Sequence, residues 1–144
     1  MKFKKNDNKK KGNLKNQSKT MAEDKGAIVE YFYMFPSEVT VRDLTEAVHC
    51  VNEDAKEIWT ELDLMEIVLS ADSLIFENMM DTFTEPGDQE FLEAKGVKVV
   101  YAASYNTKDK DLVKKILEEL HEAFGGFMAS DTEDLEPIFE VSEL

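Results

Sequence analysis

The chain has 144 residues and a formal net charge of −14, with 42% hydrophobic and 10% aromatic residues. This composition is typical of a globular protein and excludes a disordered acidic chain. The charge is divided: residues 1–20 contain eight lysines and one acid, net +7, whereas residues 21–144 contain 30 acids against nine Lys and Arg, net −21. So negative a body disfavours nucleic acid, anionic membranes and acidic substrates, and favours basic partners.

The chain has one cysteine, Cys50, so it can form no internal disulfide, which fits a reducing compartment. No apolar run approaches the ~18 residues of a membrane span, and residues 1–20 lack the apolar core of a signal peptide. We therefore expect a cytoplasmic protein that contacts no membrane. The strong preference for lysine over arginine favours an AT-rich genome, bacterial or phage.

The change of charge predicts two parts. Residues 1–25 are expected to be a disordered basic tail, because they show no apolar period that could bury a core. The tail could be an arm for nucleic acid or a partner, a solvated leader, or a segment that folds back on the acidic body. Residues 26–144 are expected to form a single acidic α+β domain.

The first predicted elements are a strand and a helix. Residues 27–35 are aromatic and β-branched and predict a central strand that ends before Pro36. Thr40 and Asp43 have the spacing of a capping box, and apolar residues at steps of three or four follow as far as Ile58. We therefore expect a helix over 41–59.

The middle of the chain allows two interpretations. Residues 64–69 and 74–79 are apolar runs separated by small and polar residues, which favours a hairpin. One continuous helix over 62–83 is the alternative, because no Gly or Pro interrupts the segment. A turn at 85–88 then leads into a short helix, which Asp88 could cap and Gly96 would end.

The last third predicts a strand, a long helix and a final strand. Residues 97–105 form the clearest strand of the chain, and an apolar stripe predicts a helix over 109–124 that Gly125 ends. Residues 127–129 start another strand, and residues 138–141 either extend it or form an edge strand beside Pro137.

The order β-α-β-β-α-β-α-β predicts the fold class. It indicates an α+β protein of the ferredoxin-like sandwich type, with two long helices on one face of a mixed or antiparallel sheet. This fold serves enzymes, regulators and binding proteins alike, so it implies no function.

Two groups of residues have side chains that could act in catalysis or bind a metal, but neither group has the spacing of such a site. His49 and Cys50 are adjacent on the expected helix, so their side chains diverge by about 100° and form no nucleophile–base pair. Asp131, Glu133, Asp134 and Glu136 offer oxygen ligands, but the glycine and glutamate of a calcium loop are absent. With no glycine-rich phosphate loop either, we predict no catalytic, cofactor or metal site, and no enzyme.

The charge supports a function in binding. We predict a small acidic, non-catalytic bacterial or phage protein-binding module of the inhibitor, immunity or mimic type, which engages a basic protein partner. The acids of the expected first helix form one stripe opposite its apolar stripe, and a second acidic cluster lies near the C-terminus. The expected partner-binding residues are Glu46, Glu53, Glu57, Glu61, Asp131, Glu133 and Asp134.

Three other functions remain open at this stage. The acids could serve solubility alone. The aromatic strands are compatible with a homodimer, and thus with a dimeric regulatory domain that binds a small molecule. An enzyme that uses acidic side chains would need convergent carboxylates, and no pair in the sequence stands out.

Overall fold

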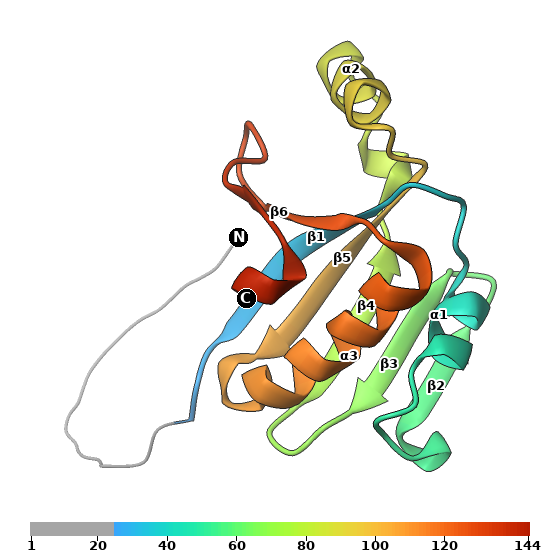
Figure 1. The fold of residues 1–144 in the computed structure, drawn as a ribbon, viewed down its shortest axis with the longest axis vertical. Coiled ribbons are helices and arrows are strands. Elements are labelled where there is room, and N and C mark those ends of the chain that lie inside the picture. The colour runs from blue at the N-terminus through green and yellow to red at the C-terminus, as the bar shows by residue number, and fades with distance from the viewer. Residues whose placement is uncertain (1–24) are drawn as a thin grey trace, which may run out of the picture.

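The computed structural model describes residues 25–144, so the predicted tail, residues 1–25, lies outside the described residues apart from Lys25. Seven strands and three α-helices make up this part of the chain (Figure 1). The strands are β1 (Ile28–Phe35), β2 (Lys56–Trp59), β3 (Leu64–Val68), β4 (Ser73–Asn78), β5 (Val99–Asn106), β6 (Phe127–Ser130) and β7 (Ile138–Phe139). The helices are α1 (Val41–Ala47), α2 (Pro86–Lys95) and α3 (Lys110–Phe124), with short 3₁₀ turns η3 (Glu53–Ala55), η4 (Met80–Thr82), η5 (Thr107–Asp109) and η6 (Val141–Glu143).

The seven strands form one sheet in the order β2-β3-β4-β5-β1-β6-β7, and all neighbouring strands are antiparallel. β1 and β5 pair along their whole length, so the two most apolar runs share a sheet, as predicted. The α+β class is right. The ferredoxin-like sandwich is wrong, because the seven-stranded antiparallel sheet and three helices do not match two helices on a four-stranded sheet.

The face of the sheet that lies under α1 and α3, here called the inner face, carries the main core (Figure 1). Tyr33 and Phe35 stack on it with ring centroids 4.3 Å apart, and the Tyr33 hydroxyl donates to the carbonyl of Gly125 at 2.8 Å. The strongly amphipathic α3 adds four fully buried side chains to this core: Val113, Ile116, Leu117 and Leu120.

The opposite face, here called the outer face, carries a second and smaller core. Phe32 packs edge to face against Phe83 at 5.3 Å between ring centroids, and Leu92 of α2 packs against the same group. Figure 1 shows α2 beyond the end of β4 and β5, so the segment between these strands covers only that end of the outer face. The outward residues buried there are Phe32, Met34, Val100, Ala102 and Ala129.

The first helix begins as predicted. The Thr40 hydroxyl accepts the N–H of Asp43 at 3.3 Å, and the Asp43 carboxylate accepts the N–H of Thr40 at 3.0 Å. This reciprocal pair is a capping box, which satisfies two backbone donors at the helix start.

The predicted helix over 41–59 is wrong beyond Ala47, because its later part forms η3 and β2. The N–H that would continue the helix at His49 donates to the Glu119 carboxylate at 2.9 Å instead. The amine of Lys56 lies 3.0 Å from the carbonyl of Thr45 and 2.5 Å from that of Val48, and so takes the place of helical donors. Inward-facing residues of a turn and a short strand reproduced the helical apolar spacing.

The hairpin at the middle of the chain is confirmed, and the continuous helix over 62–83 is wrong. β3 and β4 pair with Met65 opposite Phe76. The buried carboxylate of Asp109 accepts the N–H groups of Ala71 and Asp72 at 3.1 Å, which holds the hairpin turn against the start of α3. Because Asp109 is distant in sequence, this anchor cannot be inferred from the turn residues.

The remaining elements agree with the sequence in outline. α2 begins at Pro86 with Glu85 as its N-cap, so Asp88 is the third helical residue rather than the cap. Gly96 ends α2 in the left-handed conformation at φ 69°, which favours glycine. α3 matches its predicted range closely. Of the two alternatives for residues 138–141, the edge strand is right, because β7 pairs only with β6.

Candidate partner-binding surface

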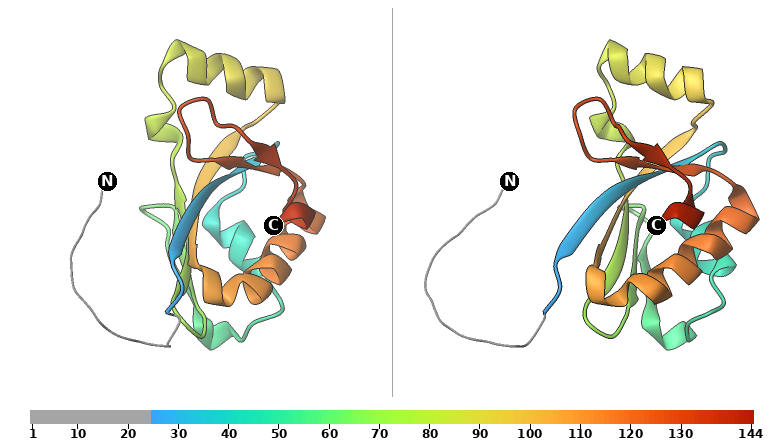
Figure 2. Two further views of the ribbon diagram at one scale, coloured as in Figure 1. Left: turned by 90° about the vertical axis from the view of Figure 1, so that its left-hand side faces the viewer. Right: turned by 60° about the vertical axis from the view of Figure 1, so that its left-hand side comes forward.

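Most of the outer face beyond the second core has no cover. In the left view of Figure 2, α1 and α3 lie on one side of the sheet, and no described helix lies on the other side below α2. We call this uncovered part the open face. It consists of the outward side chains of β2, β3 and β4, together with Ile28, Glu30 and Ser104.

The open face is acidic because glutamates occupy outward positions on neighbouring strands. Strand register places Glu57 opposite Glu66, Glu66 opposite Ile75, Ile75 opposite Ser104, and Ser104 opposite Glu30. Residues directly opposite each other share a face, so these five side chains form one row across the sheet. Like charges in directly opposite positions repel, and the pair formed by Glu57 and Glu66 is therefore unfavourable in the isolated protein.

A second row carries the fourth glutamate. Glu77 lies opposite Leu64 on one side and Ala102 on the other, and Trp59 lies opposite Leu64. Among the described residues, no lysine or arginine points outward from the strands of the open face, since Lys56 of β2 points inward to α1. The four glutamates thus lack a cationic neighbour on these strands.

The environment of Glu30 reflects this excess of negative charge. Partial burial raises the pKa of its carboxyl, and the nearby carboxylates of Asp131 and Glu77 raise it further. Asp131 comes from the loop between β6 and β7, so that loop adds charge to the same surface. Three carboxylates from elements distant in sequence therefore lie near one another on this side of the sheet.

Apolar side chains are exposed among these acids. Ile28 and Val68 are each 58% exposed and Trp59 is 36% exposed, and all three point outward. Leu62, 64% exposed, lies in the turn that follows Trp59. Large apolar side chains are thus exposed within an acidic surface.

The four acids predicted as a helical stripe do not form one, because only Glu46 lies on α1. Glu53 lies in η3 and forms an ion pair with Lys56 at 2.7 Å. Glu57 lies on β2 and belongs to the open face, while Glu61 lies in the next turn. All four are exposed, but α1 covers the inner face, so Glu46 and Glu57 belong to different sides of the sheet.

The C-terminal acids lie in the loop between β6 and β7, and all three are exposed. The Asp134 carboxylate accepts the N–H of Glu136 at 3.1 Å and the hydroxyl of Thr132 at 3.2 Å, so it stabilises the loop. Asp131 interacts with Glu30, as described above, and Glu133 shows no such link to the open face. The structure therefore brings Glu57 and Asp131 to one side of the sheet, but not all seven predicted residues.

His49 and Cys50 lie in the loop after α1 rather than on a helix. Their N–H groups both donate to Glu119, at 2.9 and 3.1 Å. Burial alone would raise the pKa of the Glu119 carboxyl, but these hydrogen bonds lower it. Cys50 is exposed as a residue, yet desolvation of its sulfur and the nearby Glu119 raise its pKa to about 11. The thiol is therefore protonated near neutral pH, which disfavours a nucleophilic role.

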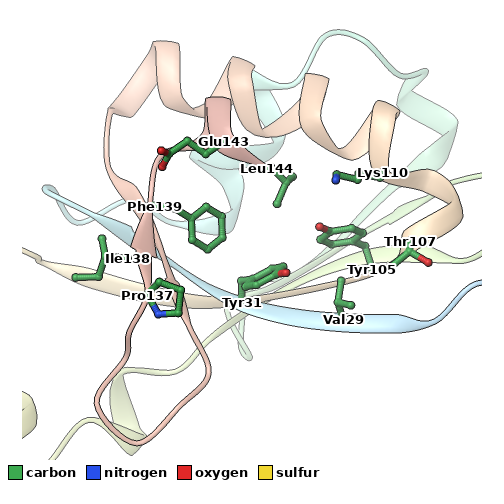
Figure 3. A pocket seen from close by; sticks show the side chains of 10 residues that line it. All are labelled: Val29, Tyr31, Tyr105, Thr107, Lys110, Pro137, Ile138, Phe139, Glu143 and Leu144. Carbon is green, nitrogen blue, oxygen red and sulfur yellow. The ribbon is translucent and has the colours of Figure 1, made fainter.

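An aromatic cleft lies on the inner face, over the first half of β1 (Figure 3). It has a volume of about 540 Å³. The Tyr31 ring lies 5.2 Å from the Phe139 ring and 6.4 Å from the Tyr105 ring, between centroids. Lys110 and Glu143 also line the cleft, so its rim has one charge of each sign. Its volume and aromatic lining are large enough for an apolar side chain.

The sequence of β3 and β4 contains a signal for the open face. In β3 and β4 the inward residues are Met65, Ile67, Leu74 and Phe76. Glu66 lies between the first two, and Glu77 directly follows Phe76. Because side chains alternate between the two faces of a strand, this pattern predicts an outward position for each glutamate. It does not predict that the face stays uncovered or that Glu30 is adjacent, since both depend on strand order.

Within residues 25–144, no three His, Cys, Asp or Glu side chains are grouped as metal ligands would be. In the same range, no helix combines the length and apolarity that crossing a membrane requires. Comparison with protein-family models, curated proteins and solved structures finds no match for this chain.

Proposed function

We propose that this protein is a non-catalytic binding module that docks a basic surface of a partner protein on its open face. The observation that supports the proposal is the row Glu57, Glu66 and Glu30, which crosses the sheet without a compensating cation on the described strands. Lysines or arginines of a partner would supply that compensation and relieve the repulsion between the glutamates.

The exposed apolar side chains support docking rather than solubility alone. An acidic surface that only keeps a protein soluble has no need for an exposed Trp59 or Val68 within it. In a complex these side chains would be buried beneath a rim of charge pairs. Such pairs steer association, so a basic partner would bind faster at low salt.

A second copy of this chain does not suit the open face as a partner. Two such faces would place glutamates against glutamates, which repel across an interface. The proposal therefore commits to a different, basic protein, as an inhibitor, an immunity protein or a mimic would bind.

The test compares two variants with the same change in net charge. The open-face variant carries Glu57→Lys, Glu66→Lys and Glu77→Lys. The control variant carries Glu46→Lys, Glu118→Lys and Glu122→Lys, which are exposed acids of α1 and α3 on the other side of the sheet. Thermal melting first establishes that both variants fold.

Wild type and control, immobilised at about 0.1 M salt, should capture the same basic protein from the lysate of the source organism. The open-face variant should bind that protein on the order of tenfold to hundredfold more weakly, because three attractive charges become repulsive. The difference should shrink at about 1 M salt, where the Debye length falls to about 3 Å. Equal loss in both variants would show that only net charge matters, and equal retention would show that the open face does not bind.

A further inference from the structure

The first half of β1 is a free strand edge. β6 pairs with Tyr31–Met34 of β1 and ends at Ser130, opposite Tyr31. β1 continues past this point from Glu30 back to Ile28, where it pairs only with β5. No other described strand pairs with this stretch, and Figure 1 shows the lower half of β1 at the margin of the sheet.

Hydrogen bonds at both ends of the ladder show which way the backbone points. The Ala27 carbonyl accepts the N–H of Thr107, and the Val100 carbonyl accepts the N–H of Met79 from the β4 side. In antiparallel strands, successive residues point their backbone groups to opposite sides. With the observed register, the N–H and C=O groups of Ile28 and Glu30 therefore point away from β5, toward the free edge.

The aromatic cleft lies beside this edge. Val29 and Tyr31 of β1 line its floor, and Phe139 and Leu144 line it from the C-terminal segment (Figure 3). Glu30 and the 58% exposed Ile28 are on the opposite face of β1, and the carboxylate of Asp131 lies near that of Glu30. A chain added along the edge would therefore have an apolar cleft on one side and acids on the other.

We propose that an extended segment of the partner adds to the free edge of β1 as an eighth strand. Its backbone would hydrogen-bond to Ile28 and Glu30, the mode of recognition by strand addition. One of its side chains would enter the cleft between Tyr31 and Phe139, and the two flanking side chains would point to the acidic side. The segment is therefore one in which basic and apolar residues alternate. The inference rests on the proposed function, since it takes the basic charge of the partner from there.

The probe is a labelled peptide of about nine residues in which lysine and valine alternate, with blocked ends. Its control has the same composition with the lysines grouped. Two further peptides carry N-methyl groups on alternate amides, one set on the odd positions and one on the even positions. Binding to the full chain is measured by fluorescence anisotropy. One methylated peptide should bind at least about tenfold more weakly than the other, because only one set of amides can face β1. The grouped peptide should also bind at least about tenfold more weakly, because its lysines cannot all point to the acidic side.

The matched protein variants are Ile28→Pro and Ile28→Ala. Proline removes the edge-facing N–H without removing a bond to β5, and it is tolerated at the first residue of a strand. Alanine removes the exposed side chain and keeps the N–H. Ile28→Pro should weaken peptide binding at least about tenfold, whereas Ile28→Ala should bind much as wild type does. The methylated peptides test the same contact on wild-type protein, independently of how well the proline variant folds.

Any of the following results would overturn strand addition: no binding to wild type, equal binding of both methylated peptides and the parent, unchanged binding by a folded Ile28→Pro, or a dimer that Ile28→Pro dissolves. The labelled peptide could also bind the full chain only after the eight tail lysines are changed to glutamine. That result would identify the tail as the occupant of the free edge, which also contradicts the proposal. If the open-face variant loses the peptide while Ile28→Pro keeps it, strand addition is wrong and the proposed function stands. The proposed function is refuted by a different result, namely that the open-face variant and the control variant bind the lysate partner equally well.

Discussion

The two faces of the sheet are built from the same strands, but the inner face is buried and most of the outer face is exposed. On β4, Leu74 and Phe76 point inward and are fully buried, whereas Ile75 and Glu77 point outward and are partly or fully exposed. Inward positions of the central strands are apolar except for Asn78 at the end of β4, so burying them under α1 and α3 stabilises the fold. The outer face forms a buried apolar core only near α2, and elsewhere its apolar residues alternate with glutamates. The helices therefore cover the face whose alternate residues are apolar, and the face with glutamates at outward positions stays exposed to solvent.

Neighbouring residues on β4 offer the sharpest test of this contrast. Phe76→Ala should destabilise the protein by about 3–5 kcal/mol, because it opens a cavity in the fully buried inner core. Ile75→Ala should cost about 1 kcal/mol, since its half-buried side chain already contacts water. Urea denaturation of both variants measures the difference. Similar losses would mean that the outer face is as well packed as the inner one.

The covered end of the outer face should respond in an intermediate way. Phe32→Ala removes the edge-to-face contact with Phe83 and should cost about 2–3 kcal/mol. The loss should be concentrated in the segment from η4 to α2, which contacts the sheet mainly through this second core. Amide hydrogen exchange checks the location. Faster exchange in α3 rather than in α2 would contradict the division into two cores.

The smallest effect is expected on the open face and has the opposite sign. Partial burial and the carboxylates of Asp131 and Glu77 raise the pKa of Glu30, so its ionised form destabilises the folded state. Folded protein then binds this proton more tightly than unfolded protein, and the penalty appears as pH rises through the folded pKa. Glu30→Gln should therefore stabilise the protein at pH 7 by about 0.5 kcal/mol or less.

The pH dependence of this gain provides its control. At a pH below the ordinary glutamate pKa of 4.5, Glu30 is protonated in both states, and the gain should vanish. Urea denaturation of Glu30→Gln and wild type at both pH values tests the sign. A variant that is less stable than wild type at pH 7 would show that Glu30 forms a favourable contact.

Local patterns in the sequence predicted most of the elements. The apolar runs of β1 and β5, the capping box at Thr40 and the stripe of α3 each depend on residues close in the chain, and each is present. The helix over 41–59 was wrong because its continuation was decided by distant partners. Lys56 binds the carbonyls of Thr45 and Val48, and Glu119 binds the N–H groups that a longer helix would use.

Topology and the candidate surface depend on long-range pairing, which the element order alone does not determine. The acids Glu30, Glu66 and Glu77 lie on three strands that come together only in the observed strand order. The sequence did indicate a basic partner from net charge, and that remains a prediction. Four of the seven predicted binding acids were assigned to a helical stripe that does not exist, and three to a C-terminal cluster. Of these seven, only Glu57 and Asp131 lie with the acids of the open face.

The position of Lys56 has a consequence for chemical labelling. Only 5% of its side chain is exposed, and its three N–H donors are directed to two carbonyls at the end of α1 and to the Glu53 carboxylate. An acylating reagent can therefore reach this amine only when α1 lifts from the sheet. The extent of modification at Lys56, set against that of the exposed lysines, records how often the first helix undocks while the rest of the protein stays folded.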